Sequence, residues 1–193
     1  MELKTVYFDR PGGDENTDRT LALARQRAEE LGINTVVVAS TVGKTSVKAV
    51  DVFKGMKVIV VTHTAGFREP NTQEYTEESR KIVEDKGGII LTTTHAFGGI
   101  SRSLNPPGPP PPAPNYVIGD LIAMTLRMFG QGMKVACEIA TMAADAGLVR
   151  TDEEVISIGG TGRGADTALV LKPDYVHRFF DLRVKEIICK PRL

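Results

Sequence analysis

Short runs of apolar residues recur along the chain and predict the strands of a β-sheet. Residues 36–39 and 58–61 are continuously apolar, which is typical of strands that are covered on both faces. By the same pattern we expect seven strands, at residues 5–8, 35–39, 57–62, 88–92, 155–159, 168–171 and 184–189.

Helical periodicity occupies most of the intervals between these strands. Residues 17–31 carry apolar side chains on one face and are followed by Gly32, which is a typical helix end. Four more helices are expected, at residues 45–53, 72–86, 116–129 and 134–146. Because helices alternate with strands, the sequence predicts a mostly parallel sheet.

Two of the strands, at residues 155–159 and 168–171, are joined by too few residues for a crossover helix, so the second is expected to run antiparallel. The predicted fold class is α/β, a three-layer αβα sandwich whose mostly parallel sheet has one antiparallel edge strand. We expect a single α/β domain over residues 1–193, with a proline-rich loop at residues 105–115. This loop is either a stiff connector, which we favour, or a segment that docks in an aromatic-lined groove.

Composition narrows the range of partners. The formal net charge is zero and the chain has no basic run, so the electrostatic footprint of a nucleic-acid-binding protein is missing. No apolar stretch approaches the roughly 20 residues that span a bilayer, so no membrane partner is expected. Cys137 and Cys189 are expected to be buried thiols, and the N-terminus has no signal-peptide pattern. We therefore expect a cytoplasmic protein.

Glycine- and hydroxyl-rich turns follow two of the predicted strands, and histidines follow two others. Small residues leave backbone N–H groups uncovered, while hydroxyls and basic side chains add donors, so such turns suit a phosphate or another compact anion. In a parallel sheet these turns converge at the carboxyl edge of the strands. The candidate binding residues are Ser40, Thr41, Gly43, Lys44, Thr45, His63, Thr64, His95, Gly160, Thr161, Gly162, Arg163, Gly164, Asp166 and Thr167.

Neither turn matches a nucleotide-binding motif in full, and each also suits a purely structural role. A P-loop needs glycine at position 38, where Val38 stands, and a dinucleotide-binding loop opens a helix, whereas a strand follows Gly164. The hydroxyl of Ser40 or Thr41 is accounted for equally well by the capping of a helix. Asp166 either orients an arginine, accepts from a ligand or forms an Asx-turn.

His63 and His95 are the candidates for acid–base groups, although both also suit hydrogen bonds to a ligand. Two histidines without a nearby carboxylate motif make a poor metal site, so no metal is expected. No serine nucleophile elbow is present, and the sequence identifies no other catalytic residue.

The two turns resemble those of the C-terminal α/β domain of pyruvate kinase. Residues 36–46, followed by the strand 58–62, have the order of strand, hydroxyl–glycine turn, short helix and strand found in that domain. The chain is also similar, over nearly its whole length, to a stand-alone, mostly archaeal family built on the same domain, whose function is unassigned. Residues 92–95, 126–132, 159–167 and 187–192 carry that similarity, and the proline-rich loop departs from it.

This resemblance implies a five-stranded core sheet with a reversed last strand, to which terminal strands are added. In the kinase the matching turns hold the phosphates of a sugar bisphosphate. Members of the stand-alone family are associated with flavin mononucleotide, whose ring would need an apolar slot near Phe67 or Phe97. The catalytic barrel of the kinase has no counterpart here, so pyruvate kinase activity is not expected.

Three functions therefore stay open. The chain binds a phosphate-bearing small molecule, with flavin mononucleotide as the first candidate, or it is a flavin-dependent oxidoreductase, or it is an oligomeric regulatory module. For the last, the methionines Met124, Met128 and Met133 are expected to form a contact surface, and a homo-oligomer is expected.

Overall fold

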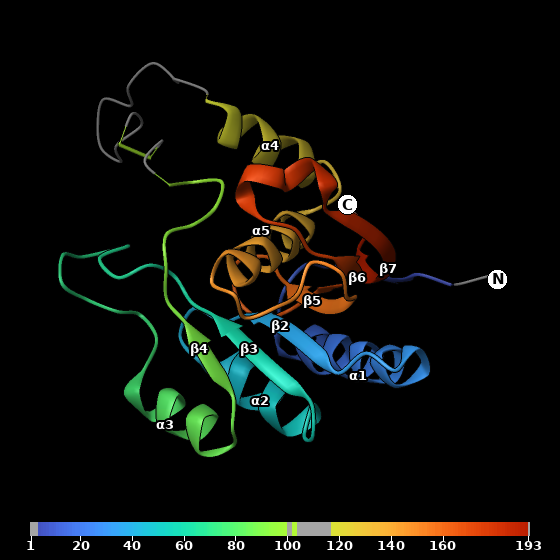
Figure 1. Cartoon of the computed structure of the whole chain (residues 1–193). Coiled ribbons are helices and arrows are strands. Elements are labelled where there is room, and N and C mark those ends of the chain that lie inside the picture. Colours follow the sequence, from blue (N-terminus) through green and yellow to red (C-terminus); the bar gives the residue numbers. More distant parts are fainter. Residues whose placement is uncertain (1–3, 100–101, 104–116, 193) are drawn as a thin grey trace.

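One seven-stranded sheet organises the chain, of which the computed structural model describes residues 4–99, 102–103 and 117–192 (Figure 1). Its spatial order is β1-β7-β6-β5-β2-β3-β4. Each predicted strand is present, with ends within two residues of those expected. The bounds are β1 Val6–Phe8, β2 Thr35–Ala39, β3 Lys57–Val61, β4 Ile89–Leu91, β5 Val155–Gly159, β6 Thr167–Lys172 and β7 Arg183–Pro191.

β6 is the one reversed strand among those described. It pairs antiparallel with β5 and with β7, whereas the other four strand pairs are parallel. The predicted antiparallel strand is thereby confirmed, and its cause is the short β5–β6 connection, which has no room for a helix. β6 forms the edge of the five-stranded part β6-β5-β2-β3-β4, and β7 and β1 extend the sheet beyond that edge.

Helices cover both faces of the sheet and give the expected three layers (Figure 1). α1 (Asp14–Leu31), α2 (Lys44–Val52) and α3 (Glu77–Asp85) lie on one face. α4 (Ile118–Arg127) and α5 (Gln131–Asp145) lie on the other, and a 3-10 helix, η2, spans Val176–Asp181. In β2, Val36 and Val38 pack with α1, α2 and α3, and Val37 packs with α5. A continuously apolar strand is explained by this double burial.

α3 begins five residues later than its predicted start at residue 72. Thr76 is its N-cap, and the Thr76 hydroxyl oxygen accepts the backbone N–H of Ser79 at 3.2 Å. Tyr75, just before the cap, is buried, and its hydroxyl lies 2.7 Å from Ser46 Oγ. Tyr75 therefore packs as part of the loop before α3, although an apolar residue at this position suggests the buried stripe of a helix over residues 72–86. The proline-rich loop at residues 105–115 lies outside the described residues.

Polar contacts join the outer strand β7 to helix α1 and join β1 to β7. Arg27 of α1 donates two hydrogen bonds of 2.7 Å to the carboxylate of Glu186 in β7. The Thr5 hydroxyl, at the start of β1, donates to the carbonyl of Ile187 at 2.9 Å. Charge-assisted bidentate pairs such as Arg27–Glu186 fix orientation as well as adding energy.

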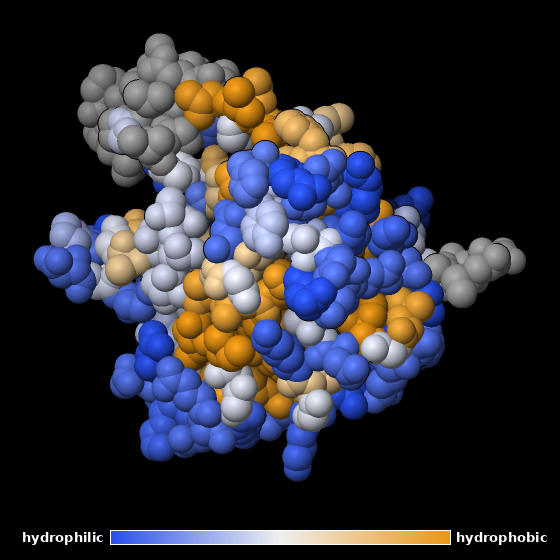
Figure 2. All heavy atoms as spheres, viewed as in Figure 1, coloured by the Kyte–Doolittle hydropathy of each residue, from blue (hydrophilic) through white to orange (hydrophobic). Residues whose placement is uncertain are grey.

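The two cysteines are buried as predicted, whereas one of the three methionines expected at the surface is buried. Cys137 and Cys189 are buried free thiols as predicted, and burial raises the pKa of Cys137 to about 12 and that of Cys189 to about 11. Met124 and Met128 are exposed, but Met133 is buried in the core and is not part of a surface. Figure 2 shows apolar side chains gathered over α4. None of the described helices has the length and hydrophobicity that a membrane span requires.

Candidate functional site

The turns that follow β2 and β5 leave the sheet side by side. β2 and β5 are parallel neighbours, and their register pairs Val38 with Ile158. Two residues farther along, Ser40 and Gly160 leave the carboxyl ends of the two strands at the same level, about 5 Å apart. The two predicted turns thus meet at one edge of the sheet.

The turn after β2 leads into the N-terminus of α2. Gly43 is the N-cap of this helix, with a φ of 108° that favours glycine. Ser40 Oγ accepts the backbone N–H of Ser46 at 3.3 Å, so this buried hydroxyl does serve the helix start. Within the described part of the chain, the backbone N–H groups of Lys44 and Thr45 have no acceptor, and the first turn of α2 carries no carboxylate. Unpaired N–H groups of this kind, at the start of a helix, are the donors with which helices bind anions.

The turn after β5 is hydrogen-bonded to the loop between β1 and α1 and to the first turn of α1. The N–H of Gly13 donates to the carbonyl of Arg163 at 3.0 Å, and the N–H of Ala165 donates to Thr17 Oγ1 at 2.9 Å. Among the described residues, no acceptor faces the N–H groups of residues 160–164, and the Arg163 side chain is exposed. Hydrogen bonds from its far side therefore hold the turn in place, and its own backbone N–H groups have no acceptor among the described residues.

Asp166 and Thr167 lie in the interior beneath this second turn. Asp166 Oδ2 accepts the N–H of Gly12 at 2.9 Å, and Oδ1 accepts the Thr167 hydroxyl at 2.7 Å. The carboxylate thus holds the β1–α1 loop against the turn. No hydrogen bond or ion pair joins Asp166 to Arg163 in the described structure.

The other turn residues differ in exposure. Lys44 and Gly162 are exposed, Thr41, Gly160, Thr161 and Gly164 are half-buried, and Gly43 and Thr45 are buried.

His63 and His95 follow β3 and β4 and meet at the same edge of the sheet. Their ring centroids are 5.3 Å apart, and the Phe67 ring lies 4.2 Å from His63 and 5.3 Å from His95. His63 Nδ1 lies 2.7 Å from Glu74 Oε2, a contact that orients the imidazole ring. The Arg102 guanidinium lies 4.5 Å from the Phe67 ring centroid. Thr64, next to His63, is half-buried.

The loop before α3 connects this histidine cluster to the first turn. Gln73 Nε2 donates to the carbonyl of His63 at 3.0 Å, and Tyr75 reaches Ser46 of α2. Burial raises the pKa of Tyr75, and the bond to Ser46 opposes that rise. Gln73, Glu74 and Tyr75 were not predicted as site residues, because an irregular loop has no periodicity that would place its side chains.

A buried ion pair lies beside the histidine cluster. Lys134 and Glu138 of α5 are 6% and 5% exposed, and Lys134 Nζ bonds to Glu138 Oε2. Glu138 Oε1 also accepts the N–H of Phe97 at 3.0 Å, and Lys134 Nζ lies 5.5 Å from the Phe97 ring. Burial lowers the pKa of Lys134 and lowers that of His95 to about 4, an effect that the Glu138 charge opposes. His95 is therefore uncharged at neutral pH.

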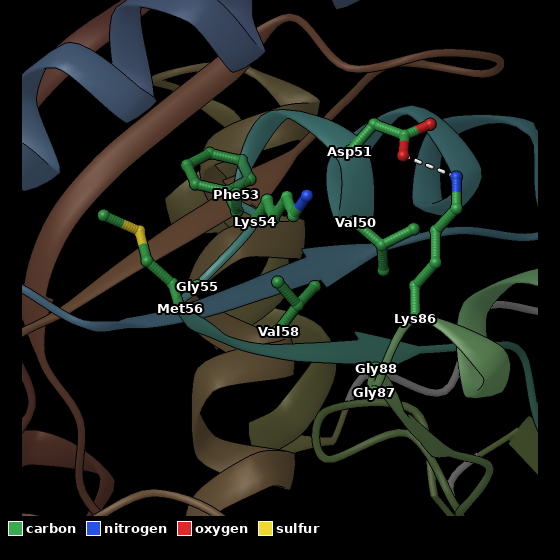
Figure 3. Close-up of a pocket in the computed structure, with 10 residues that line it drawn as sticks. All are labelled: Val50, Asp51, Phe53, Lys54, Gly55, Met56, Val58, Lys86, Gly87 and Gly88. Carbon is green, nitrogen blue, oxygen red and sulfur yellow. Dashed lines mark hydrogen bonds and ion pairs between the residues drawn. The ribbon is translucent and has the colours of Figure 1, made fainter.

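Cavities lie at several places away from the paired turns. One of about 220 Å³ opens at the opposite, amino-terminal edge of the sheet, where it is lined by Val50, Phe53 and Val58 and, at one side, by the 2.5 Å ion pair of Asp51 and Lys86 (Figure 3). A second of about 360 Å³ is lined in part by His95, the one predicted site residue found in either cavity. In the described part of the chain, no three or more histidine, cysteine, aspartate or glutamate side chains lie close enough together to hold a metal ion.

A match to a known protein family covers most of the chain. Residues 18–171 match the family described as the pyruvate kinase alpha/beta domain. The match includes both turns and the histidine cluster, and it leaves β1 and β7 outside its limits.

Proposed function

The chain belongs to the pyruvate kinase alpha/beta domain family, and from that premise we propose that it binds a phosphate-bearing small molecule at the turns after β2 and β5. One observation carries the proposal. Two adjacent turns present backbone N–H groups that no described acceptor takes up, at the carboxyl edge of paired parallel strands.

Charge supports the same proposal. The first turn of α2 has no carboxylate and bears Lys44, whereas α1 and α3 begin with acidic residues that neutralise their own positive ends. Arg163 stands exposed on the second turn, where its guanidinium is able to clasp two phosphate oxygens. An anion between the turns would therefore meet donors from both.

Flavin mononucleotide is the first candidate ligand, and the residues at this edge fit it. Its phosphate suits the paired turns, and its ring needs an apolar surface. Phe97 is 6% exposed and packs against Phe179 at 5.0 Å, so it offers little surface. Phe67 is half-buried beside His63 and is the better contact for a planar ring. When bound, this cofactor supplies electron and hydride transfer.

A flavin-dependent oxidoreductase is the second candidate, and the His63–Glu74 contact favours it. A carboxylate at Nδ1 fixes the imidazole tautomer and leaves Nε2 to hold or move a proton. His95 beside it is uncharged and suits a hydrogen bond to a ligand. Reduction of the bound flavin by a nicotinamide donor would distinguish this enzyme from a binding protein.

The first experiment measures ligand binding directly. We expect the purified protein, mixed with flavin mononucleotide, to retain absorbance at about 450 nm after desalting and to melt at a higher temperature. Inorganic phosphate in excess should compete. If neither flavin mononucleotide nor phosphate raises the melting temperature, the proposed function is wrong.

The second experiment locates the site. Arg163→Ala and Thr41→Val should each weaken binding by about 1.5–3 kcal/mol, the usual contribution of a hydrogen bond to a charged group. Arg150→Ala is the matched control, because Arg150 is an exposed arginine before the amino end of β5, at the opposite edge. Equal affinity of all three variants in isothermal titration calorimetry would remove the turns from the site.

A further inference from the structure

Exposed apolar side chains are concentrated on α4 and the neighbouring η2. Of the eleven large hydrophobic residues that are exposed in the described part of the chain, seven lie on these two elements or directly after α4. Met128 is 80% exposed, Phe180 78% and Ile118 74%. The seven are Ile118, Leu121, Met124, Met128, Phe129, Val176 and Phe180. Isolated exposed apolar residues are ordinary, but a cluster of this kind marks an interaction surface.

The α4 residues of this cluster form a continuous ridge. Ile118, Leu121 and Met124 follow one another at three-residue intervals, and Met128 comes four residues later, so all four lie on one side of the helix. Thr125, also on this side, donates its hydroxyl to the carbonyl of Leu121 at 2.8 Å and offers no unsatisfied polar group. Beside the ridge, a groove of about 450 Å³ runs between α4 and η2.

Two opposite charges lie along one flank of the ridge. Asp120 lies in the first turn of α4, where its Oδ2 accepts the N–H of Val117 at 3.4 Å, and Arg127 lies in the last turn, where its Nε donates to Gln131 Oε1 at 2.8 Å. The proposed contact between copies uses the second carboxylate oxygen of Asp120 and the outer guanidinium nitrogens of Arg127. Seven residues make about two helical turns, so both side chains lie on the same side of the helix, close to the ridge. The midpoint between them falls next to Met124, near the centre of the ridge.

From this arrangement we propose that α4 pairs with α4 of a second copy of the chain, antiparallel, about a two-fold axis near Met124. The antiparallel pair brings Asp120 of each copy beside Arg127 of the other and buries both apolar ridges between them. A parallel pair would instead place like charges together, which disfavours it. The same two-fold axis places the two α4–η2 grooves on one flank of the contact, so Phe180 of each copy extends the apolar surface.

The oligomeric state of the full chain tests the surface. Sedimentation equilibrium over roughly a hundredfold range of protein concentration should show a dimer or an even-numbered assembly. Leu121→Glu and Met128→Glu should each raise the dissociation constant at least about tenfold. Val52→Glu, at an exposed apolar position of α2 on the other face, is the control and should have no effect. A monomeric wild type, or an assembly that neither variant weakens, would overturn the proposal.

A charge exchange tests the orientation of the two helices. Asp120→Arg and Arg127→Asp should each weaken association, because each leaves like charges facing one another. Asp120→Arg also removes the acceptor of the Val117 N–H, but the double variant lacks that acceptor too, so a recovery of affinity in the double variant reports the charge pairing alone. The double variant exchanges the two signs and should restore most of the affinity. Circular dichroism of each variant verifies that the fold is retained. If the double variant associates more weakly than both single variants, the antiparallel pairing is wrong. This result is independent of ligand binding at the other site.

Discussion

His95 stands where protonation is unfavourable. The side chain is half-buried next to His63, and the charges of Arg102, His63 and Lys134 add to the effect of burial, so that its pKa falls from 6.5 to about 4. Glu138 opposes this shift but does not overcome it. A neutral imidazole at this position keeps both a donor and an acceptor nitrogen available at neutral pH.

This shift predicts how stability changes with pH. In the unfolded chain His95 takes up a proton below about pH 6.5, whereas in the folded protein it stays neutral until about pH 4. Above pH 6.5 His95 is neutral in both states, so it does not affect the free energy of unfolding. As the pH falls from 6.5 towards 4, only the unfolded chain takes up the proton, so the free energy of unfolding decreases. Allowing for solvent screening, we expect a loss of about 1–2 kcal/mol between about pH 7 and pH 5.

Urea unfolding of the wild type and of His95→Gln at the two pH values measures this loss. The pH dependence of the unfolding free energy should be smaller in the variant by about 1–2 kcal/mol. His177→Gln, at an exposed histidine, is the matched control and should behave like the wild type. The same pH dependence in all three proteins would contradict the shift.

The sequence identifies a single site residue only where a polar, chemically reactive side chain stands directly after a predicted strand. His63 and His95 were recognised because each follows an apolar strand. Lys134 and Glu138 were not, since a lysine and a glutamate four residues apart are common on exposed helices. Their burial depends on how α5 lies against the loop after β4, and this tertiary contact leaves no local pattern.

At the scale of elements, the start of α5 is pressed against the hairpin of β5 and β6. A Cβ atom built on Gly132 would lie 2.1 Å from Thr167 Oγ1 and 2.6 Å from Asp166 Oδ1. These two atoms form the buried Thr167–Asp166 hydrogen bond, and the other oxygen of the same carboxylate accepts the N–H of Gly12. The absence of a side chain at Gly132 therefore sets the distance between α5 and the turn.

Gly132→Ala should destabilise the protein even though alanine is the better helix former. The gain in helix propensity is about 1 kcal/mol, while overpacking against buried polar atoms costs about 1–3 kcal/mol and also disturbs the Asp166 bonds. We expect a net loss of about 1–2 kcal/mol in chemical denaturation. Gln131→Ala, one residue earlier and half-buried, should change stability by about 0.5 kcal/mol or less. An equal effect of both changes would contradict the close packing at Gly132.

Elements were predictable where burial makes their pattern strong. β2 and β5 begin and end at the predicted residues, because both are buried on two faces. The start of α3 was misplaced because its cap at Thr76 follows a loop whose Tyr75 looks like part of a helical stripe. The position of β6 within the full sheet was not evident, since it depends on the pairing of β7 at the far end of the chain.

In the whole molecule, the carboxyl edge of the sheet carries two linked groups of polar residues. The paired turns follow β2 and β5, and the histidine cluster follows β3 and β4. The consecutive residues Glu74 and Tyr75 contact the two groups, through His63 and through Ser46. A ligand that displaces α2 should therefore also move Glu74, the hydrogen-bond partner of His63.

The pairing of β1 with β7 joins residues from nearly opposite ends of the chain. The Thr5–Ile187 hydrogen bond spans 182 positions of sequence, and β1 contributes three residues to the sheet. Closing so long a loop costs conformational entropy before any contact forms to compensate for it. A strand of three residues makes few contacts, so it compensates for little of this cost. β1 should therefore be the last strand to join during folding and the first to detach. In native-state hydrogen exchange, we expect the amides of β1 to exchange through local opening, well before those of β2 and β5. Equal protection of β1 and β2 would show instead that the sheet opens only as one cooperative unit.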